Sequence, residues 1–210
     1  MVISAPHVIQ LVLNRGRLGY YRVQYDKAGY KWMRADFISK SPHLPGIDRA
    51  AFVYDLSAFA RSGRTRTVEV LELVRYVVND TDSEVWEAAL TFLRDLESLL
   101  WEQSQDEQNA LKRFSASIVG DTYMTLGLYA GKNETATKGK MRQLILPVAG
   151  RAGIPSLVDD SLKILGSIYD RENGLPGAEL PDLPANFMAV TLETVSLGGV
   201  WVSEKVLTWV

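Results

Sequence analysis

The chain has 210 residues, 47% of them hydrophobic, which is enough to bury the core of one large domain or of one domain with an appendage. Its formal net charge of −2 argues against a nucleic-acid partner, because such partners favour a clustered excess of basic residues. The absence of cysteine excludes disulfides, thiolate metal sites and cysteine nucleophiles, and it is compatible with a reducing, cytoplasmic location. No apolar run approaches the roughly 18 residues of a membrane helix, so we expect no membrane segment in this chain.

The first predicted element is a β-hairpin over Leu11–Tyr25. A polar, glycine-bearing turn at Asn14–Gly19 separates a short alternating run from Tyr20–Tyr25, which is rich in aromatic and β-branched residues. A lone hairpin is marginally stable in water and leaves edge hydrogen-bonding groups unpaired. The apolar pattern of Trp201–Val210 at the other end has no stop signal. We therefore interpret the chain as a fragment of a longer polypeptide.

The remainder of the chain predicts helices of about 12 to 20 residues separated by short breaks. Asp48 is the expected N-cap of the second helix, and Thr81 with Glu84 has the spacing of a capping box. We expect an interruption near Gly120. The predicted helices cover residues 27–40, 48–61, 67–78, 84–100, 105–130, 140–151, 155–171 and 184–197.

This sequence of helices predicts a mainly α fold, in which stacked antiparallel helices follow the hairpin and form a curved superhelix of the HEAT or armadillo kind. No strict repeat is present, so the superhelix is expected to be irregular. The predicted division of the chain is a hairpin part, residues 1–29, and a helical domain, residues 30–210, which we expect to be truncated at its C-terminal end.

Catalytic motifs are absent from the sequence. The two histidines, His7 and His43, belong to no His-Glu-x-x-His helix, which would place two zinc ligands on one face. There is no Gly-x-Ser-x-Gly turn for a nucleophilic serine and no phosphate-binding Gly-x-x-x-x-Gly-Lys loop. Asp159 and Asp160 lack the alternating spacing of a calcium loop and suit the first turn of a helix better.

Aromatic residues gather where the hairpin meets the first helix: Tyr20, Tyr21, Tyr25, Tyr30 and Trp32. Two interpretations stay open for this cluster. It is either a contact surface with a preceding domain or the packed core of a small interface.

Several segments resemble zinc-dependent aminopeptidases of the alanyl and puromycin-sensitive family. Gly19-Tyr-Tyr-Arg-Val-Gln-Tyr-Asp26 is similar to the strand pair that ends their small β-sandwich and leads into a helical C-terminal domain. Further similar segments follow in the family's order: Pro45–Ala50, Asp55–Gly63, Leu71–Asp82 with Trp86, Arg142–Gly150 and Leu183–Gly199. Asp80 stands where the family usually has Glu.

The resemblance implies that residues 1–29 are the remnant of a β-sandwich and that the rest is a non-catalytic lid. In such enzymes the helical domain encloses the active-site chamber and limits which peptides reach the zinc. It implies zinc for the parent enzyme only, with the catalytic domain of the same polypeptide and the peptide substrate as partners. No catalytic or metal residue carries over, so we expect this chain to be inactive alone. Arg142 is the candidate for contact with substrate, with a salt-bridged surface arginine as the alternative. A free-standing helical scaffold that binds a peptide or protein is the competing functional hypothesis.

Overall fold

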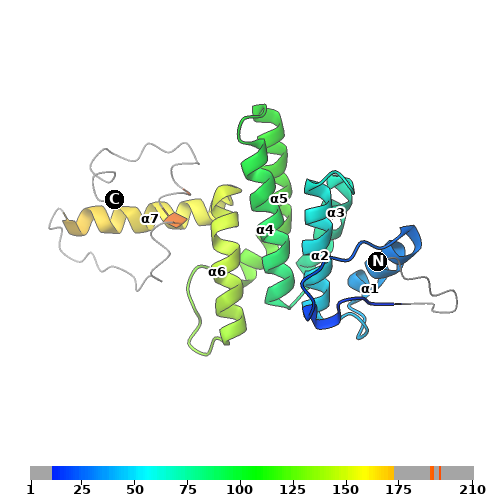
Figure 1. Ribbon diagram of the computed structural model, residues 1–210. Coiled ribbons are helices and arrows are strands. Elements are labelled where there is room, and N and C mark those ends of the chain that lie inside the picture. Colours follow the sequence, from blue (N-terminus) through cyan, green and yellow to red (C-terminus); the bar gives the residue numbers. More distant parts are fainter. Residues whose placement is uncertain (1–10, 173–189, 192–193, 195–210) are drawn as a thin grey trace. The chain divides into compact units, whose positions relative to one another are not determined.

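The computed structural model describes residues 11–172, 190, 191 and 194 (Figure 1). These residues form α-helices and two short 3-10 helices and contain no strand, which confirms the mainly α class. Two compact units divide between Phe92 and Leu93, inside one helix. The elements are η1 (Arg15–Arg17), α1 (Lys27–Ser39), α2 (Gly46–Arg61), α3 (Thr67–Val74), η2 (Arg75–Asn79), α4 (Ser83–Leu100), α5 (Gln105–Leu126), α6 (Ala136–Arg151) and α7 (Pro155–Glu172).

The hairpin expected over Leu11–Tyr25 is wrong for the described residues. The turn forms, because Asn14 adopts a left-handed conformation and leads into η1, but the two arms do not pair as strands. Their backbone groups bond to side chains instead. The N–H of Leu13 donates to the Tyr25 hydroxyl, and the Asn14 amide donates to the carbonyl of Tyr21.

This N-terminal segment, Leu11–Tyr25, is fastened to the side of α2 by two aspartates. The N–H of Gly16 donates to Asp48 Oδ1 at 2.6 Å, and the N–H of Val23 donates to Asp55 Oδ2 at 2.9 Å. Each donor lies 32 residues before its acceptor, so the two contacts are spaced seven residues apart on both partners. Seven residues are about two helical turns, which places both carboxylates on the same face of α2.

The helix α2 begins two residues earlier than the sequence indicates. Pro45 is its N-cap, and Asp48 lies in the first turn with its carboxylate turned to the N-terminal segment. A Cβ at Gly46 would come within 1.5 Å of the Asp82 carboxylate, so a larger residue there would displace the side chain that accepts the N–H of Glu84. Asp48 is therefore a binding residue for the preceding segment rather than a cap.

The core of the first unit is built around aromatic rings and the buried ion pair between Arg49 and Asp80. Phe52 contacts the rings of Tyr25, Tyr30 and Phe37, with centroids 5.9 to 6.5 Å apart. For Tyr25 and Tyr30 these contacts match the core-packing interpretation, whereas Tyr20 and Tyr21 are exposed. The contact surface with a preceding domain stays a prediction for those two residues.

The start of α4 is fixed by acidic side chains that bond backbone amides. Asp82, not Thr81, caps the helix: its carboxylate accepts the N–H of Glu84, and its carbonyl accepts the N–H of Trp86. The cap therefore lies one residue after the predicted Thr81, and Val85, which follows Asp82 by three residues, cannot complete a capping box. The helix then buries Trp86, Leu90 and Leu93 of the predicted apolar stripe, whereas Leu96 and Leu100 near its end are half-buried.

The second unit contains the C-terminal part of α4 and the helices α5, α6 and α7, with α5 packed on α6. A capping box between Ser104 and Glu107 begins α5, which runs unbroken through Gly120 and ends at Gly127 with φ of 64°. The interruption predicted at Gly120 is therefore absent. Thr135 caps α6 through the N–H of Lys138. Most of the predicted helix 184–197, and all of Trp201–Val210, lie outside the described residues.

Candidate functional site

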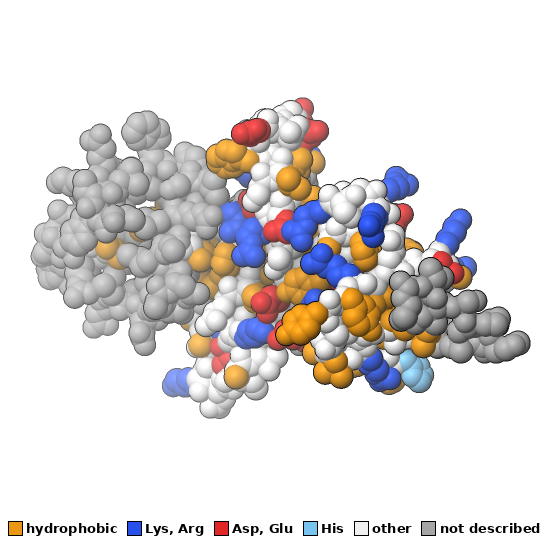
Figure 2. Space-filling model, in the orientation of Figure 1, with side chains coloured by type: hydrophobic (Ala, Val, Ile, Leu, Met, Phe, Trp, Pro, Cys, Tyr) orange, Lys and Arg blue, Asp and Glu red, His pale blue; other side chains and the backbone are white. Residues whose placement is uncertain are grey.

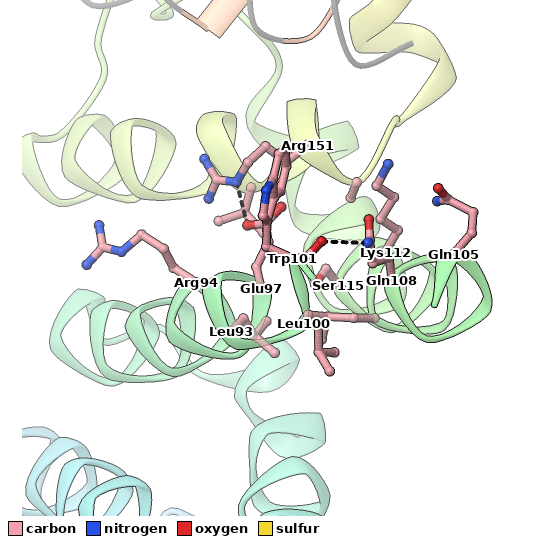
Figure 3. Close-up of a pocket in the computed structure, with 13 residues that line it drawn as sticks. Leu93, Arg94, Glu97, Leu100, Trp101, Gln105, Gln108, Lys112, Ser115 and Arg151 are labelled. Carbon is pink, nitrogen blue, oxygen red and sulfur yellow. Dashed lines mark hydrogen bonds and ion pairs between the residues drawn. The ribbon is translucent and has the colours of Figure 1, made fainter. Parts of the chain in front are cut away.

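The second unit contains a groove of about 200 Å³ between the end of α4, the first half of α5 and the end of α6. All its lining residues belong to the second unit. We call it the α4–α6 groove. The lining residues are Leu93, Arg94, Glu97, Leu100, Trp101, Gln105, Gln108, Leu111, Lys112, Ser115, Val148, Arg151 and Ala152 (Figure 3).

The walls of the α4–α6 groove are apolar and come from three helices. Leu93 and Leu100 lie seven residues apart on α4, so the same helical face supplies both. Leu111 adds a side chain from α5, and Val148 adds one from α6. The Trp101 ring stands at the rim and is 71% exposed, which is unusual for the largest apolar side chain.

The turn that carries Trp101 is held by α5. The side-chain amide of Gln108 donates from Nε2 to the carbonyl of Trp101 at 2.9 Å and to the carbonyl of Gln103 at 3.1 Å. These bonds satisfy acceptors at the C-terminal end of α4, where the helix has no internal donors left. The position of Trp101 is therefore set by its backbone, and its ring stays free for contact.

The charges at the groove are unequal. Arg151 donates from Nε to Glu97 Oε2 at 2.7 Å, so one guanidinium is matched by one carboxylate. Arg94 and Lys112 have no ion pair with any of the described residues. Figure 3 shows them on opposite sides of Trp101, and Figure 2 shows Lys and Arg side chains over this part of the surface. The groove thus combines apolar walls with two unmatched positive charges.

Arg142, the residue singled out from the sequence, lies elsewhere in the second unit and is only 6% exposed. Its guanidinium forms a two-pronged ion pair with Glu134, including Nη2 to Oε1 at 2.6 Å. It also donates to the carbonyls of Leu126 and Gly127, at 2.8 and 3.0 Å. Hydrogen bonding by Arg142 lowers the pKa of Glu134 below its ordinary value.

These contacts give Arg142 a structural role that the sequence did not reveal, because they tie the end of α5 to the loop before α6. They favour the salt-bridged alternative, with the difference that the pair is buried rather than at the surface. Contact of Arg142 with substrate stays a prediction. No sequence signal separates this arginine from a solvated one, since Glu134 lies outside α6 and at no helical spacing from it.

The described residues hold no group of three or more His, Cys, Asp or Glu side chains that would suit a metal ion. His43 lies exposed in the loop between α1 and α2 (pale blue in Figure 2), and His7 falls outside the described residues. Asp160 pairs with Lys163 at 3.1 Å in the first part of α7. The zinc that the resemblance implies for a parent enzyme does not fit any site in the described part of this chain.

Comparison with known proteins matches this helical chain to one family. A family model described as the ERAP1-like C-terminal domain covers residues 11–207. The chain belongs to this family. The relatives that this ERAP1-like C-terminal domain matches are aminopeptidases, in line with the resemblance of its sequence segments to the alanyl and puromycin-sensitive family.

Individual relatives agree with this assignment. The domain is 24% identical to a puromycin-sensitive aminopeptidase of Caenorhabditis elegans over 76% of the chain and 17% of the relative. It is 26% identical to the alanine/arginine aminopeptidase of Saccharomyces cerevisiae over 89% of the chain and 22% of the relative. A thyrotropin-releasing hormone-degrading ectoenzyme of Mus musculus shares 30% identity over 54% of the chain and 10% of the relative. The chain therefore spans about a fifth or less of the length of these relatives.

The α4–α6 groove was missed by sequence reasoning. Its walls use Leu93 and Leu100, which the sequence assigns to the buried stripe of α4. The one signal that could have found it is Trp101, a large apolar residue at the very end of a helix, followed at once by polar turn residues.

None of the described helices is both long and apolar enough to cross a membrane.

Proposed function

We propose that this ERAP1-like C-terminal domain is a non-catalytic lid of a zinc aminopeptidase, enclosing the active-site chamber and limiting which peptides enter it. The observation that carries the proposal is the family match over residues 11–207, supported by aminopeptidase relatives that are several times longer than this chain. The catalytic domain of the same polypeptide is the proposed partner, and peptides that lose their N-terminal residue are the proposed substrates.

In this arrangement zinc and the catalytic groups belong to the parent's catalytic domain, and this chain restricts access of peptides to them. Stacked helices are suited to that task because each pair buries its apolar faces and leaves polar faces and helix ends for contact with peptides. A curved superhelix, expected from the sequence, would form the wall of the chamber. We place the enzyme in the cytoplasm as part of the same proposal, which fractionation of cells expressing the tagged parent would test.

The test separates catalysis from access. The 210-residue chain alone should release no fluorophore from an amino-acid amide, with or without added zinc. KM is then measured for a single-residue amide and for peptides of three to twelve residues, using the polypeptide that joins this domain to a catalytic domain. Removal of the helical domain should change KM for the peptides much more than KM for the amide. Chelator-sensitive release by the chain alone, or equal effects on both substrate types, would contradict the proposal.

The competing hypothesis of a free-standing scaffold draws support from one observation, the exposed Trp101 above an apolar groove. A scaffold would bind its partner with full affinity as an isolated chain and would have no effect on any peptidase. The affinity for the peptide or protein partner is therefore measured with the isolated chain and with the domain joined to a catalytic domain. Equal affinities without any effect on peptidase activity would favour the scaffold.

A further inference from the structure

We propose that the α4–α6 groove binds a peptide segment in which a large apolar side chain stands next to an aspartate or glutamate side chain. This inference rests on the proposed lid function, because it names the class of peptide that the domain contacts. It adds a binding site to a domain in which the family resemblance assigns no residue.

The size of the groove suits side chains rather than a whole small molecule. Sites for drug-sized ligands usually measure about 300 to 1,000 Å³. The α4–α6 groove measures about 200 Å³ and is walled by leucine and valine side chains. The groove therefore has room for one leucine-sized or aromatic side chain, and the exposed ring of Trp101 can cover that side chain from the rim.

The charges at the groove favour an acidic residue next to the apolar side chain of the bound peptide. Glu97 already matches Arg151, so a bound cation would find no unmatched carboxylate among the lining residues. Arg94 and Lys112 stand on either side of Trp101 without an ion-pair partner in the described residues. A ligand carboxylate next to the apolar side chain reaches one of these two cations whichever way the peptide runs.

Polar side chains along the groove favour a peptide over an anionic lipid. Gln105 and Ser115 line it together with the apolar walls, and both carry hydrogen-bonding groups that a peptide backbone can use. A lipid chain has no groups to bond them. Recognition of lipid headgroups uses clusters of about four to eight basic residues, whereas the lining of the groove has three, of which Arg151 is paired with Glu97.

The binding experiment uses the full 210-residue chain and peptides blocked at both ends, so that only side chains carry charge. The probe is acetyl-Ala-Ala-Leu-Glu-Ala-Ala-amide, with Gln in place of Glu, Lys in place of Glu, and Ala in place of Leu as comparison peptides. Binding is followed by calorimetry and by tryptophan fluorescence, with Trp101→Phe to identify the signal of the groove. We expect the Leu-Glu peptide to bind most tightly and the Lys peptide most weakly.

The protein variants test the same contacts from the other side. An exposed ion pair contributes at most about fivefold in affinity. Arg94→Ala and Lys112→Ala should each weaken binding by no more than about twofold, because the peptide can still pair with the other cation, and the double variant should weaken it by up to about fivefold. Lys132→Ala, an exposed lysine in the loop before α6, is the control and should leave binding unchanged. The differences between variants should shrink as salt is raised from 50 to 500 mM.

Equal affinity for the Glu, Gln and Lys peptides, or no effect of Arg94 and Lys112 together, would overturn the inference. Binding to phosphatidylserine vesicles in preference to every peptide would overturn it as well. None of these results bears on the lid function, which is measured by KM in the joined enzyme. Conversely, loss of the length-dependent effect on KM with intact peptide binding would refute the lid and leave the groove site standing.

Discussion

The ion pair between Arg49 and Asp80 should contribute more to the stability of the first unit than any other pair described in it. Both residues are buried, at 8% and 6% exposure. Arg49 donates to both carboxylate oxygens of Asp80, at 2.9 and 3.0 Å, and to the carbonyl of Leu44 at 2.9 Å. The carbonyl of Asp80 in turn accepts the indole N–H of Trp86 at 2.8 Å. The pair therefore connects α2 with the turn that begins α4.

Substitution Arg49→Ala leaves a buried carboxylate without its counter-charge and a carbonyl without its donor. Removing one partner of a buried pair typically costs about 3–5 kcal/mol, and we expect a loss in that range. Because a domain is stabilised by only about 5–15 kcal/mol, this loss should bring the first unit close to unfolding. Urea denaturation followed by the fluorescence of tryptophan, with Trp86 inside the cluster, measures the change.

Two further variants show whether the loss of stability in Arg49→Ala comes from leaving the Asp80 charge buried without a partner. Lys163→Ala removes an exposed pair in α7 and should cost less than about 1 kcal/mol. Asp80→Asn combined with Arg49→Met should be less destabilised than Arg49→Met alone, because no uncompensated charge stays buried. The reasoning is refuted if Arg49→Ala and Lys163→Ala cost the same, or if neutralising Asp80 deepens the loss.

Three more outcomes follow from the contacts described. Arg142→Ala should lower the unfolding midpoint of the second unit and increase hydrogen exchange in the loop before α6. Arg142→Lys should have an intermediate effect, because lysine cannot form the two-pronged pair with Glu134. Unchanged hydrogen exchange would argue against the structural role of Arg142. Ser104→Ala should cost about 1 kcal/mol through loss of the cap of α5, measured by thermal unfolding. Burial raises the pKa of Asp55, so the contribution of this group to folding is largest below its unfolded pKa and is lost as pH rises through its folded pKa. The free energy of unfolding of Asp55→Asn, compared with wild type from pH 3 to 7, should lack that decline.

The helices could be predicted from the sequence because each one combines an apolar stripe with a breaking signal at its ends. The start of α7 at Pro155 and the end of α1 before the two prolines are examples. Caps were less predictable, since Asp48, Thr81 and Asp82 are all suitable residues and only tertiary contacts decide among them. The carboxylate of Asp48 was already bonded to Gly16, 32 residues away, and no local pattern records that bond.

The hairpin and the groove show what local pattern cannot supply. Strand-like composition at Tyr20–Tyr25 predicts extended backbone, but pairing depends on a partner strand, and within the described residues the amide of Val23 bonds a helix side chain. The α4–α6 groove depends on where three helices diverge, and residues such as Leu93 and Val148 have the same pattern whether they fill a core or line a hollow. The buried pair of Arg142 and Glu134 likewise depends on the path of a loop.

The paired spacing of Gly16–Asp48 and Val23–Asp55 has a mechanical consequence. A force applied to the N-terminal segment along its length is carried into the flank of α2 by two hydrogen bonds, before it reaches the first turn of α1. The two bonds lie one after the other along the segment, so a pull from its N-terminal end loads the Gly16 bond first and the Val23 bond once the first has broken. Any domain joined to this segment would therefore pull on α2, and tension or torque from it would be delivered to the Phe52 core instead of being absorbed by a slack connection.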